Sequence, residues 1–190
     1  MDWKKLGEER RADEHRFYCV VSGDKEWYAD DYSYLSVNGH VEAVNNYVIF
    51  KTSVVTILQK KIDGGIELRF ISGNNRGVDA MTESLANDLG VDVYRYEADW
   101  DTNGRKAGFV RNEEMFFGVG PKKHKGCILF WNGENHYTLN QIYQAYLFGV
   151  PCRVYNYRQK RWLSKEEIEA IQYQERNKQI DFKRNRKEGN

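Results

Sequence analysis

A polar segment at residues 72–79 has the residue types that bind anions. It is Ser-Gly-Asn-Asn-Arg-Gly-Val-Asp, and it joins an apolar run to a segment with helical spacing. Glycines let the backbone approach a ligand closely, and free N–H groups at a helix start attract phosphate. Arg76 adds a side chain suited to a bidentate contact with phosphate or carboxylate. In the alternative interpretation, Gly73 and Gly77 only form the turn and Asp79 only stabilises the helix N-terminus.

A second polar segment, residues 97–115, joins the next apolar run to the next helical one and contains Asp99, Trp100, Arg111 and Asn112. We expect Arg111 in the first turn of that helix, where a cation opposes the helix dipole. The pattern therefore indicates a bound anion beside Arg111 or an internal carboxylate such as Asp99, and both interpretations stay open.

Two more segments follow predicted strands, at residues 22–24 (Ser-Gly-Asp) and 131–134 (Trp-Asn-Gly-Glu). In an open parallel sheet, ligands bind beyond the carboxyl ends of the strands, near the point where strand order reverses. We therefore expect the four segments to meet at one edge of a sheet. Trp100, Trp131 or Tyr137 would then stack a flat ligand or close the pocket.

The elements needed to place these segments alternate along the chain. Apolar runs predict strands at residues 17–23, 66–72, 92–96, 126–131 and 151–155, and apolar spacing predicts helices at 47–61, 77–89, 109–117 and 139–148. This order is typical of an α/β, Rossmann-like domain with a parallel sheet flanked by helices. Residues 97–108 read as a loop, and the aromatic-rich residues 24–46 read as an insertion, a loop or a small hairpin turning at Asn38-Gly39.

The predicted organisation is a polar N-terminal arm (1–16), the Rossmann-like domain (17–160) and a C-terminal helix with a basic tail (161–190). Ser164 and Glu167 fit a capping box at the start of the last helix, and the tail begins at residue 178. A face of the helix before it, with Ile142, Tyr143, Tyr146 and Leu147, is either a homodimer contact or buried within one subunit.

The amino-acid composition limits the kinds of partner and ligand that we expect the protein to bind. The net charge is +1, from 29 basic and 28 acidic residues, so we expect no nucleic-acid partner, and the basic tail lacks interleaved aromatics. No stretch approaches the roughly 20 apolar residues of a membrane helix, and the first sixteen residues lack a signal-peptide core. The scattered cysteines and histidines predict no metal site and favour a cytoplasmic protein with free thiols.

Residues 71–115 together with 127–155 resemble the YspA-like branch of the SLOG superfamily. The resemblance rests on the SG-x-x-x-G-x-D element and the ADW…G-x-x-AG-x-x-RN element, and it spans residues 17–155. It implies a Rossmann-like fold that senses, makes or processes a nucleotide-derived ligand. With the strand-end residues, the expected ligand-binding set is Ser22, Gly23, Gly73, Asn74, Asn75, Arg76, Gly77, Asp79, Asp99, Trp100, Arg111, Asn112, Trp131, Asn132, Gly133 and Thr138.

The more distant lonely-guy phosphoribohydrolases share this layout, but the chain departs from them at three positions. Asn74 follows Gly73 where a second glycine is usual. Tyr137 precedes Thr138 where glycine is usual. Gln141 stands at the catalytic glutamate position, and an amide cannot act as a general base.

Two functions follow as expectations. The first is binding or sensing of a nucleotide or nucleotide-derived small molecule without turnover, which includes sequestration of a signalling nucleotide. The second is N-glycosidic bond hydrolysis or transfer, for which the candidate carboxylates are Asp24, Asp79, Asp99 and Glu134. No cofactor beyond the nucleotide-like ligand is expected.

Overall fold

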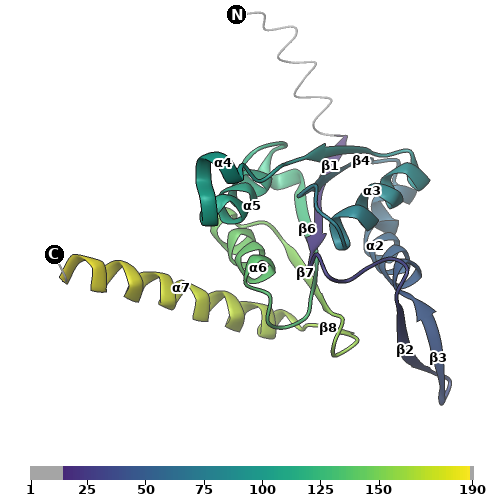
Figure 1. Ribbon diagram of the computed structural model, residues 1–190. Helices are drawn as coiled ribbons and strands as arrows, with labels where there is room; N and C mark the ends of the chain where they lie inside the picture. Colours follow the sequence, from purple (N-terminus) through teal and green to yellow (C-terminus); the bar gives the residue numbers. More distant parts are fainter. Residues whose placement is uncertain (1–14, 189–190) are drawn as a thin grey trace, which may run out of the picture.

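The computed structural model describes residues 15–188 and contains one six-stranded sheet and one small hairpin (Figure 1). The sheet order is β5-β4-β1-β6-β7-β8, and all neighbours are parallel except the β7–β8 pair. The chain therefore winds outward from β1 through β4 to β5, then crosses to β6 and continues to β7. The strands are β1 Arg16–Gly23, β4 Glu67–Ser72, β5 Asp92–Arg95, β6 Lys125–Trp131, β7 Cys152–Asn156 and β8 Arg161–Trp162.

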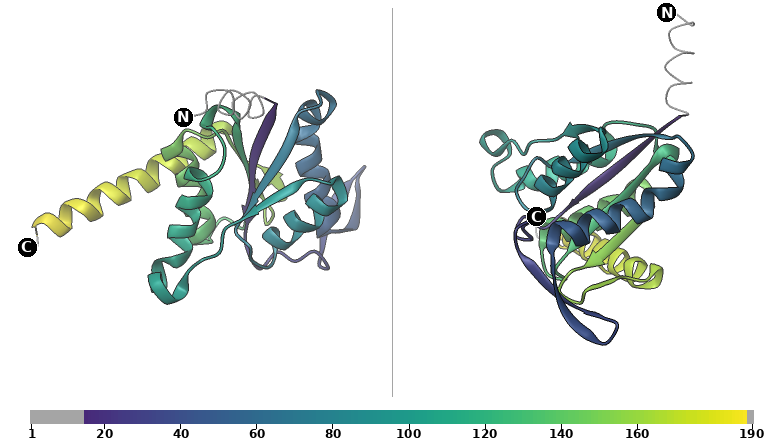
Figure 2. Two further views of the ribbon diagram at one scale, coloured as in Figure 1. Left: turned by 90° about the horizontal axis from the view of Figure 1, so that it is seen from above. Right: turned by 90° about the vertical axis from the view of Figure 1, so that its right-hand side faces the viewer.

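Helices cover both faces of this sheet (Figures 1 and 2), which confirms the predicted α/β, Rossmann-like class. On one face lie α2 (Asn46–Asp63) and α3 (Val78–Leu89), and on the other lie α5 (Ala107–Phe117) and α6 (His136–Phe148). Strand order reverses between β1 and β6, because β4 and β5 extend to one side of β1 and β7 to the other. Such a switch point is where ligands of this fold class bind.

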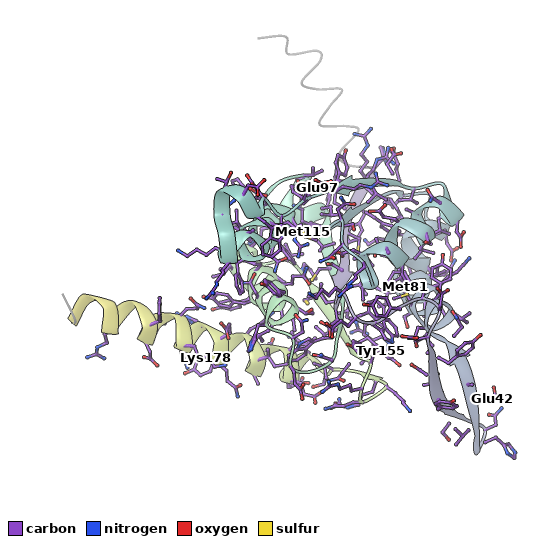
Figure 3. All side chains as sticks on the ribbon, in the orientation of Figure 1. Glu42, Met81, Glu97, Met115, Tyr155 and Lys178 are labelled. Atoms are coloured by element: carbon purple, nitrogen blue, oxygen red, sulfur yellow. The ribbon has the colours of Figure 1, made fainter. Side chains whose placement is uncertain are left out.

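Strand residues alternate between two hydrophobic cores, as the two-residue period of a strand requires. On β1, Cys19 and Val21 face the α2–α3 core, whereas Tyr18 and Val20 face the α5–α6 core. Met81 and Met115, labelled in Figure 3, belong to the first and the second core respectively. The apolar runs of the sequence are continuous because both faces of the sheet are buried.

The segment between β1 and α2 forms a hairpin of β2 (Tyr32–Val37) and β3 (His40–Asn45) that projects from the body (Figure 1). Its two turn residues, Asn38 and Gly39, both have positive φ (51° and 82°), as a two-residue hairpin turn requires. Before the hairpin, Trp27 is 4 % exposed and stacks on Phe130, with ring centroids 5.2 Å apart. Trp27 thus anchors the insertion in the core, and Ala29, Leu35 and Val44 also pack against that core.

Three predictions about the elements were wrong in detail. Residues 100–106 are not a loop but a short helix, α4 (Trp100–Asn103), and a 3-10 turn, and α5 begins at Ala107. The strand at 152–156 is not the last, because β8 adds an antiparallel edge.

The third wrong prediction concerns the basic segment from residue 178. It does not form a separate tail but continues α7 (Lys165–Glu188), since no glycine or proline interrupts it before Gly189. The predicted capping box is present: the Glu167 N–H donates to Ser164 Oγ and the Ser164 N–H donates to Glu167 Oε2. None of the helices in the described part of the chain is long and apolar enough to span a membrane.

Candidate functional site

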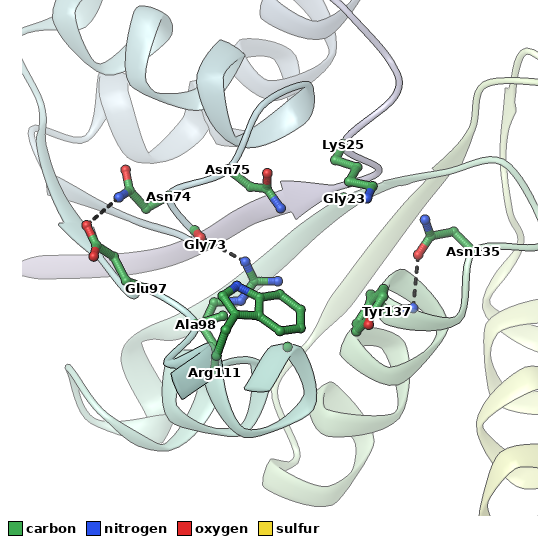
Figure 4. A pocket seen from close by; sticks show the side chains of 12 residues that line it. Gly23, Lys25, Gly73, Asn74, Asn75, Glu97, Ala98, Arg111, Asn135 and Tyr137 are labelled. Atoms are coloured by element: carbon green, nitrogen blue, oxygen red, sulfur yellow. Dashed lines mark hydrogen bonds between the residues drawn. The ribbon is translucent and has the colours of Figure 1, made fainter. Parts of the chain in front are cut away.

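A cavity of about 380 Å³ opens at the carboxyl ends of β1, β4, β5 and β6, at the switch point of the sheet (Figure 4). Figure 4 shows Asn74 and Glu97 on one side of it and Asn135 and Tyr137 on the other. Its lining residues are Gly23, Lys25, Gly73, Asn74, Asn75, Glu97, Ala98, Trp100, Gly108, Arg111, Asn135 and Tyr137.

The loop after β4 forms one wall of this cavity, and its shape depends on two unusual backbone conformations. Asn74 has φ +49° and donates from Nδ2 to Glu97 Oε1 at 2.7 Å, which fixes both side chains at the rim. Gly77 has φ +69°, and a Cβ built there would lie 2.5 Å from the carbonyl oxygen of Asp24. A glycine is needed here because the loops after β1 and β4 touch.

Gly77→Ala is therefore expected to destabilise the fold more than an alanine at another glycine with positive φ. Gly65 is the matched control, because it has φ +68° and nothing lies within 4 Å of its built Cβ. We expect about 1–2 kcal/mol for Gly65→Ala from the left-handed backbone alone. The clash at Gly77 should add about 1–3 kcal/mol, measured by urea unfolding. Equal losses for the two variants would contradict the close approach of the two loops.

Beneath the loop lies Asp79, a carboxylate that is 2 % exposed. Ser22 donates from Oγ to Asp79 Oδ1 at 2.6 Å. Burial raises the pKa of Asp79, while the Ser22 hydroxyl, the Arg111 charge and the backbone N–H groups of Gly73 and Asn75 oppose that rise. The loop thus directs these two N–H groups at an internal carboxylate, Asp79, and not at the phosphate that the segment was expected to bind.

Arg111 lies between this carboxylate and the cavity. It is 8 % exposed, and its Nη1 donates to the Gly73 carbonyl at 2.8 Å, a contact drawn in Figure 4. Nη2 donates to Asn112 Oδ1 at 3.1 Å. Burial lowers the pKa of Arg111 and the Asp79 charge raises it. Because α5 begins at Ala107, Arg111 is in the second turn of the helix rather than the first.

An internal carboxylate does lie beside Arg111, but it is not Asp99, so the expected pairing of Arg111 with Asp99 was wrong. Asp99 Oδ1 instead accepts the Thr102 N–H at 2.9 Å and caps α4. Hydrogen bonds from the Thr102 side chain and from the Thr102 N–H lower the pKa of Asp99. The residue that compensates Arg111 is Asp79, which lies 32 residues earlier in the sequence, and both side chains lie beside Gly73 in the loop after β4. A parallel sheet brings such distant segments together at one edge, which a local pattern does not reveal.

A buried amide network supports the floor of the cavity. Gln141, 1 % exposed, donates from Nε2 to Ser22 Oγ at 2.9 Å and to Asn112 Oδ1 at 3.3 Å. Asn112 donates in turn to the Tyr137 carbonyl at 3.0 Å. Gln141 is therefore below the cavity and does not line it. Its Oε1 has no hydrogen-bond partner among the described residues.

The loop after β6 is held by its own side chains. The Asn135 side chain caps α6 by accepting the N–H groups of Tyr137 (2.9 Å) and Thr138 (3.1 Å). Asn132 Oδ1 accepts the N–H groups of Glu134 and Asn135, both at 2.7 Å. These backbone donors are consequently not free for an anionic ligand.

Asp24 ties the same loop to β1. It is 1 % exposed and accepts the Asn132 N–H at 2.9 Å, the Tyr157 hydroxyl at 2.8 Å and the Thr138 hydroxyl. Burial raises the pKa of Asp24, and these three donors counteract the rise. With its oxygens occupied, Asp24 has a structural position rather than a catalytic one.

Aromatic rings border the cavity near α4 and α6. Trp100 is 54 % exposed and Tyr137 is 36 % exposed. The Tyr137 ring packs on Gly108, where a built Cβ would lie 2.5 Å from a ring carbon, and its centroid is 5.1 Å from that of Phe109. The bulky ring at position 137 is therefore accommodated by a glycine on the facing helix.

The structure brings only part of the expected ligand-binding set to the cavity surface. Gly23, Gly73, Asn74, Asn75, Trp100 and Arg111 line it, whereas Ser22, Gly77, Asp79, Asn112 and Thr138 are buried beside or beneath it. The remaining five do not line it: Arg76, Asp99, Trp131, Asn132 and Gly133.

Two of these five have other clear contacts. Arg76 lies over the Tyr28 ring, 5.8 Å from its centroid. Trp131 is 7 % exposed, packs in the α5–α6 core and donates from its indole N–H to the Asn135 carbonyl at 3.1 Å. The Glu134 carboxylate, a catalytic candidate, forms an exposed ion pair with Arg158 at 2.8 Å.

Sequence reasoning missed Lys25, Glu97 and Asn135 as lining residues. Lys25 and Glu97 each lie two residues beyond a strand end, and Asn135 is the N-cap of α6. Counting polar residues within the first few positions after each strand would have found all three.

Comparison of the chain with protein-family models, with curated proteins and with solved structures gives no match.

Proposed function

We propose that this protein binds a nucleotide or nucleotide-derived small molecule in the switch-point cavity and does not turn it over. The observation that carries the proposal is the set of side chains around one cavity: two exposed rings, two cations, three amides and one carboxylate. Rings stack a planar base, cations meet phosphate, and amides read polar edges. The volume of about 380 Å³ suits a ligand of nucleotide size.

In this proposal the anionic part of the ligand is bound by side chains. The N–H groups of Gly73 and Asn75 meet Asp79, and those of Tyr137 and Thr138 meet Asn135. Lys25 and Arg111 are the cations that line the cavity. A phosphate would therefore lie near Arg111 and not in a glycine-rich backbone cradle.

Hydrolysis of the bound ligand has less support than binding alone. Most glycosidases use a pair of carboxylates that flank the scissile bond. Of the described residues that line the cavity, Glu97 alone is acidic. Asp79 is buried beneath the floor, Asp99 caps α4 and Glu134 pairs with Arg158. N-glycosidic hydrolysis is thus the second candidate function and depends on Glu97.

The same arrangement supports a proposed distant relationship to the YspA-like branch of the SLOG superfamily. The two sequence elements that carry the resemblance follow β4 and β5, and both contribute residues to the one cavity. A homodimer is proposed through α6, for which Tyr146 and Leu147 are 41 % and 52 % exposed. Ile142 cannot contribute to that contact because it is fully buried within the chain.

Tryptophan fluorescence tests the proposal with adenosine, the four ribonucleoside 5′-monophosphates and NAD as probes. A base that stacks on Trp100 should quench its emission saturably. Trp100→Phe should keep the affinity but lose that quenching, whereas Trp100→Ala should weaken binding by about 1–3 kcal/mol, the usual value of one base–aromatic stack. The proposed function would be refuted if no probe changed the fluorescence of the wild-type protein saturably and calorimetry detected no heat of binding.

A further inference from the structure

Two cysteines far apart in the sequence are direct neighbours across the sheet. Cys127 on β6 is the register partner of Cys152 on β7. Register partners on adjacent strands project to the same face, and both side chains pack in the α5–α6 core. The third cysteine, Cys19, packs in the core on the opposite face of the sheet.

The two thiols are in contact and differ in access. Burial and the neighbouring Cys152 thiol raise the pKa of Cys127, which is 2 % exposed. Cys152 is partly exposed and lines a second cavity of about 460 Å³, bounded by α6, β7 and α7. Arg153, Lys165 and Glu169 line the same cavity, and Lys165 forms an ion pair with Glu169 at 3.5 Å. This cavity gives a small oxidant a route to Cys152.

We propose that Cys152 and Cys127 form a peroxide-sensitive dithiol site that closes to an intrachain disulfide. The Cys152 sulfur attacks hydrogen peroxide, the O–O bond breaks, and Cys152 becomes a sulfenic acid as one water leaves. The Cys127 sulfur then attacks the Cys152 sulfur, the S–O bond breaks, and the second water leaves with the Cys127 proton. Two thiols and one peroxide give one disulfide and two waters.

The raised pKa of Cys127 sets the pH dependence of the second step. The thiolate is the attacking species, so closure is slow at neutral pH. While the pH remains below the pKa of Cys127, the thiolate fraction and the closure rate increase about tenfold per pH unit. The sulfenic acid at Cys152 should consequently accumulate at pH 7 and disappear faster at pH 8.5.

The test is hydrogen peroxide treatment of the full native chain, followed by intact-mass measurement and non-reducing peptide mapping. We expect a loss of about 2 Da, a 127–152 cross-linked peptide and full reversal by dithiothreitol. Cys19→Ser is the matched control and should behave as the wild-type protein does. Cys127→Ser, checked for native circular dichroism, should instead trap a sulfenic acid at Cys152 that dimedone labels.

A disulfide that includes Cys19, a cross-link between two chains, or oxidation of both thiols without any disulfide would overturn the proposal. So would peroxide treatment that leaves all three thiols reduced at pH 8.5. None of these outcomes depends on what the switch-point cavity binds.

Discussion

Asp79→Ala is expected to destabilise the fold by about 3–5 kcal/mol, because it leaves a buried cation without its compensating charge. The cation is Arg111, 8 % exposed; burial lowers the pKa of Arg111, and the Asp79 charge is the larger of the two influences that oppose this. The same change removes the acceptor for the Ser22 hydroxyl and for the N–H groups of Gly73 and Asn75. Urea unfolding followed by circular dichroism measures the loss.

Asp99→Ala is the matched control for this prediction. Both carboxylates follow a strand, but Asp99 is exposed and caps only the four-residue helix α4. Its removal should cost far less than that of Asp79. Asp79→Asn should fall between the two, since the amide keeps an oxygen acceptor but no charge. A loss at Asp79 no larger than that at Asp99 would show that Asp79 does not hold the floor of the cavity.

Arg111→Gln is expected to weaken the binding of a phosphorylated ligand by about 10- to 150-fold, which corresponds to a charge-assisted contact of about 1.5–3 kcal/mol. Glutamine can still donate to the Gly73 carbonyl, so the loop after β4 keeps a partner. Calorimetric titration with the tightest-binding ribonucleotide measures the change, and the unphosphorylated nucleoside should lose much less.

Arg76→Gln separates this prediction from a general effect of charge. Arg76 precedes Gly77 in the same loop, yet it is exposed and lies over Tyr28 away from the cavity. The substitution should leave affinity within about twofold of wild type, as expected for an exposed charge outside the site. Equal losses for the two arginine variants would place the anion elsewhere.

The fold could be predicted from the sequence because its signals are local. Buried runs such as the one ending at Ser22 and the helix-ending glycines, Gly90 and Gly149, mark the parallel sheet and its crossovers. The turn at Asn38-Gly39 marks the hairpin. Four strand-end segments were expected at one edge of the sheet, and those after β1, β4 and β5 each contribute residues to the cavity. After β6 the lining residues are instead Asn135 and Tyr137, which lie beyond the expected segment 131–134.

The side-chain roles were harder to predict because they depend on contacts between those segments. Asp79 reaches back to Ser22 and Arg111 reaches across to Gly73, and neither pairing follows from spacing. Trp131 follows the period of its strand into the core and so does not face a ligand. Lys25 and Glu97 belong to no motif, yet loop geometry places both at the cavity.

The most direct test of the central claim is native mass spectrometry of the wild-type protein, as purified and after addition of the nucleotide panel. The account predicts one nucleotide-class molecule per chain, retained with unchanged mass on prolonged incubation and lost in Arg111→Gln but not in Arg76→Gln. A chain that carries nothing and binds no member of the panel would contradict the proposed function. A bound nucleotide that is converted to free base and ribose phosphate would contradict the absence of turnover and point to Glu97.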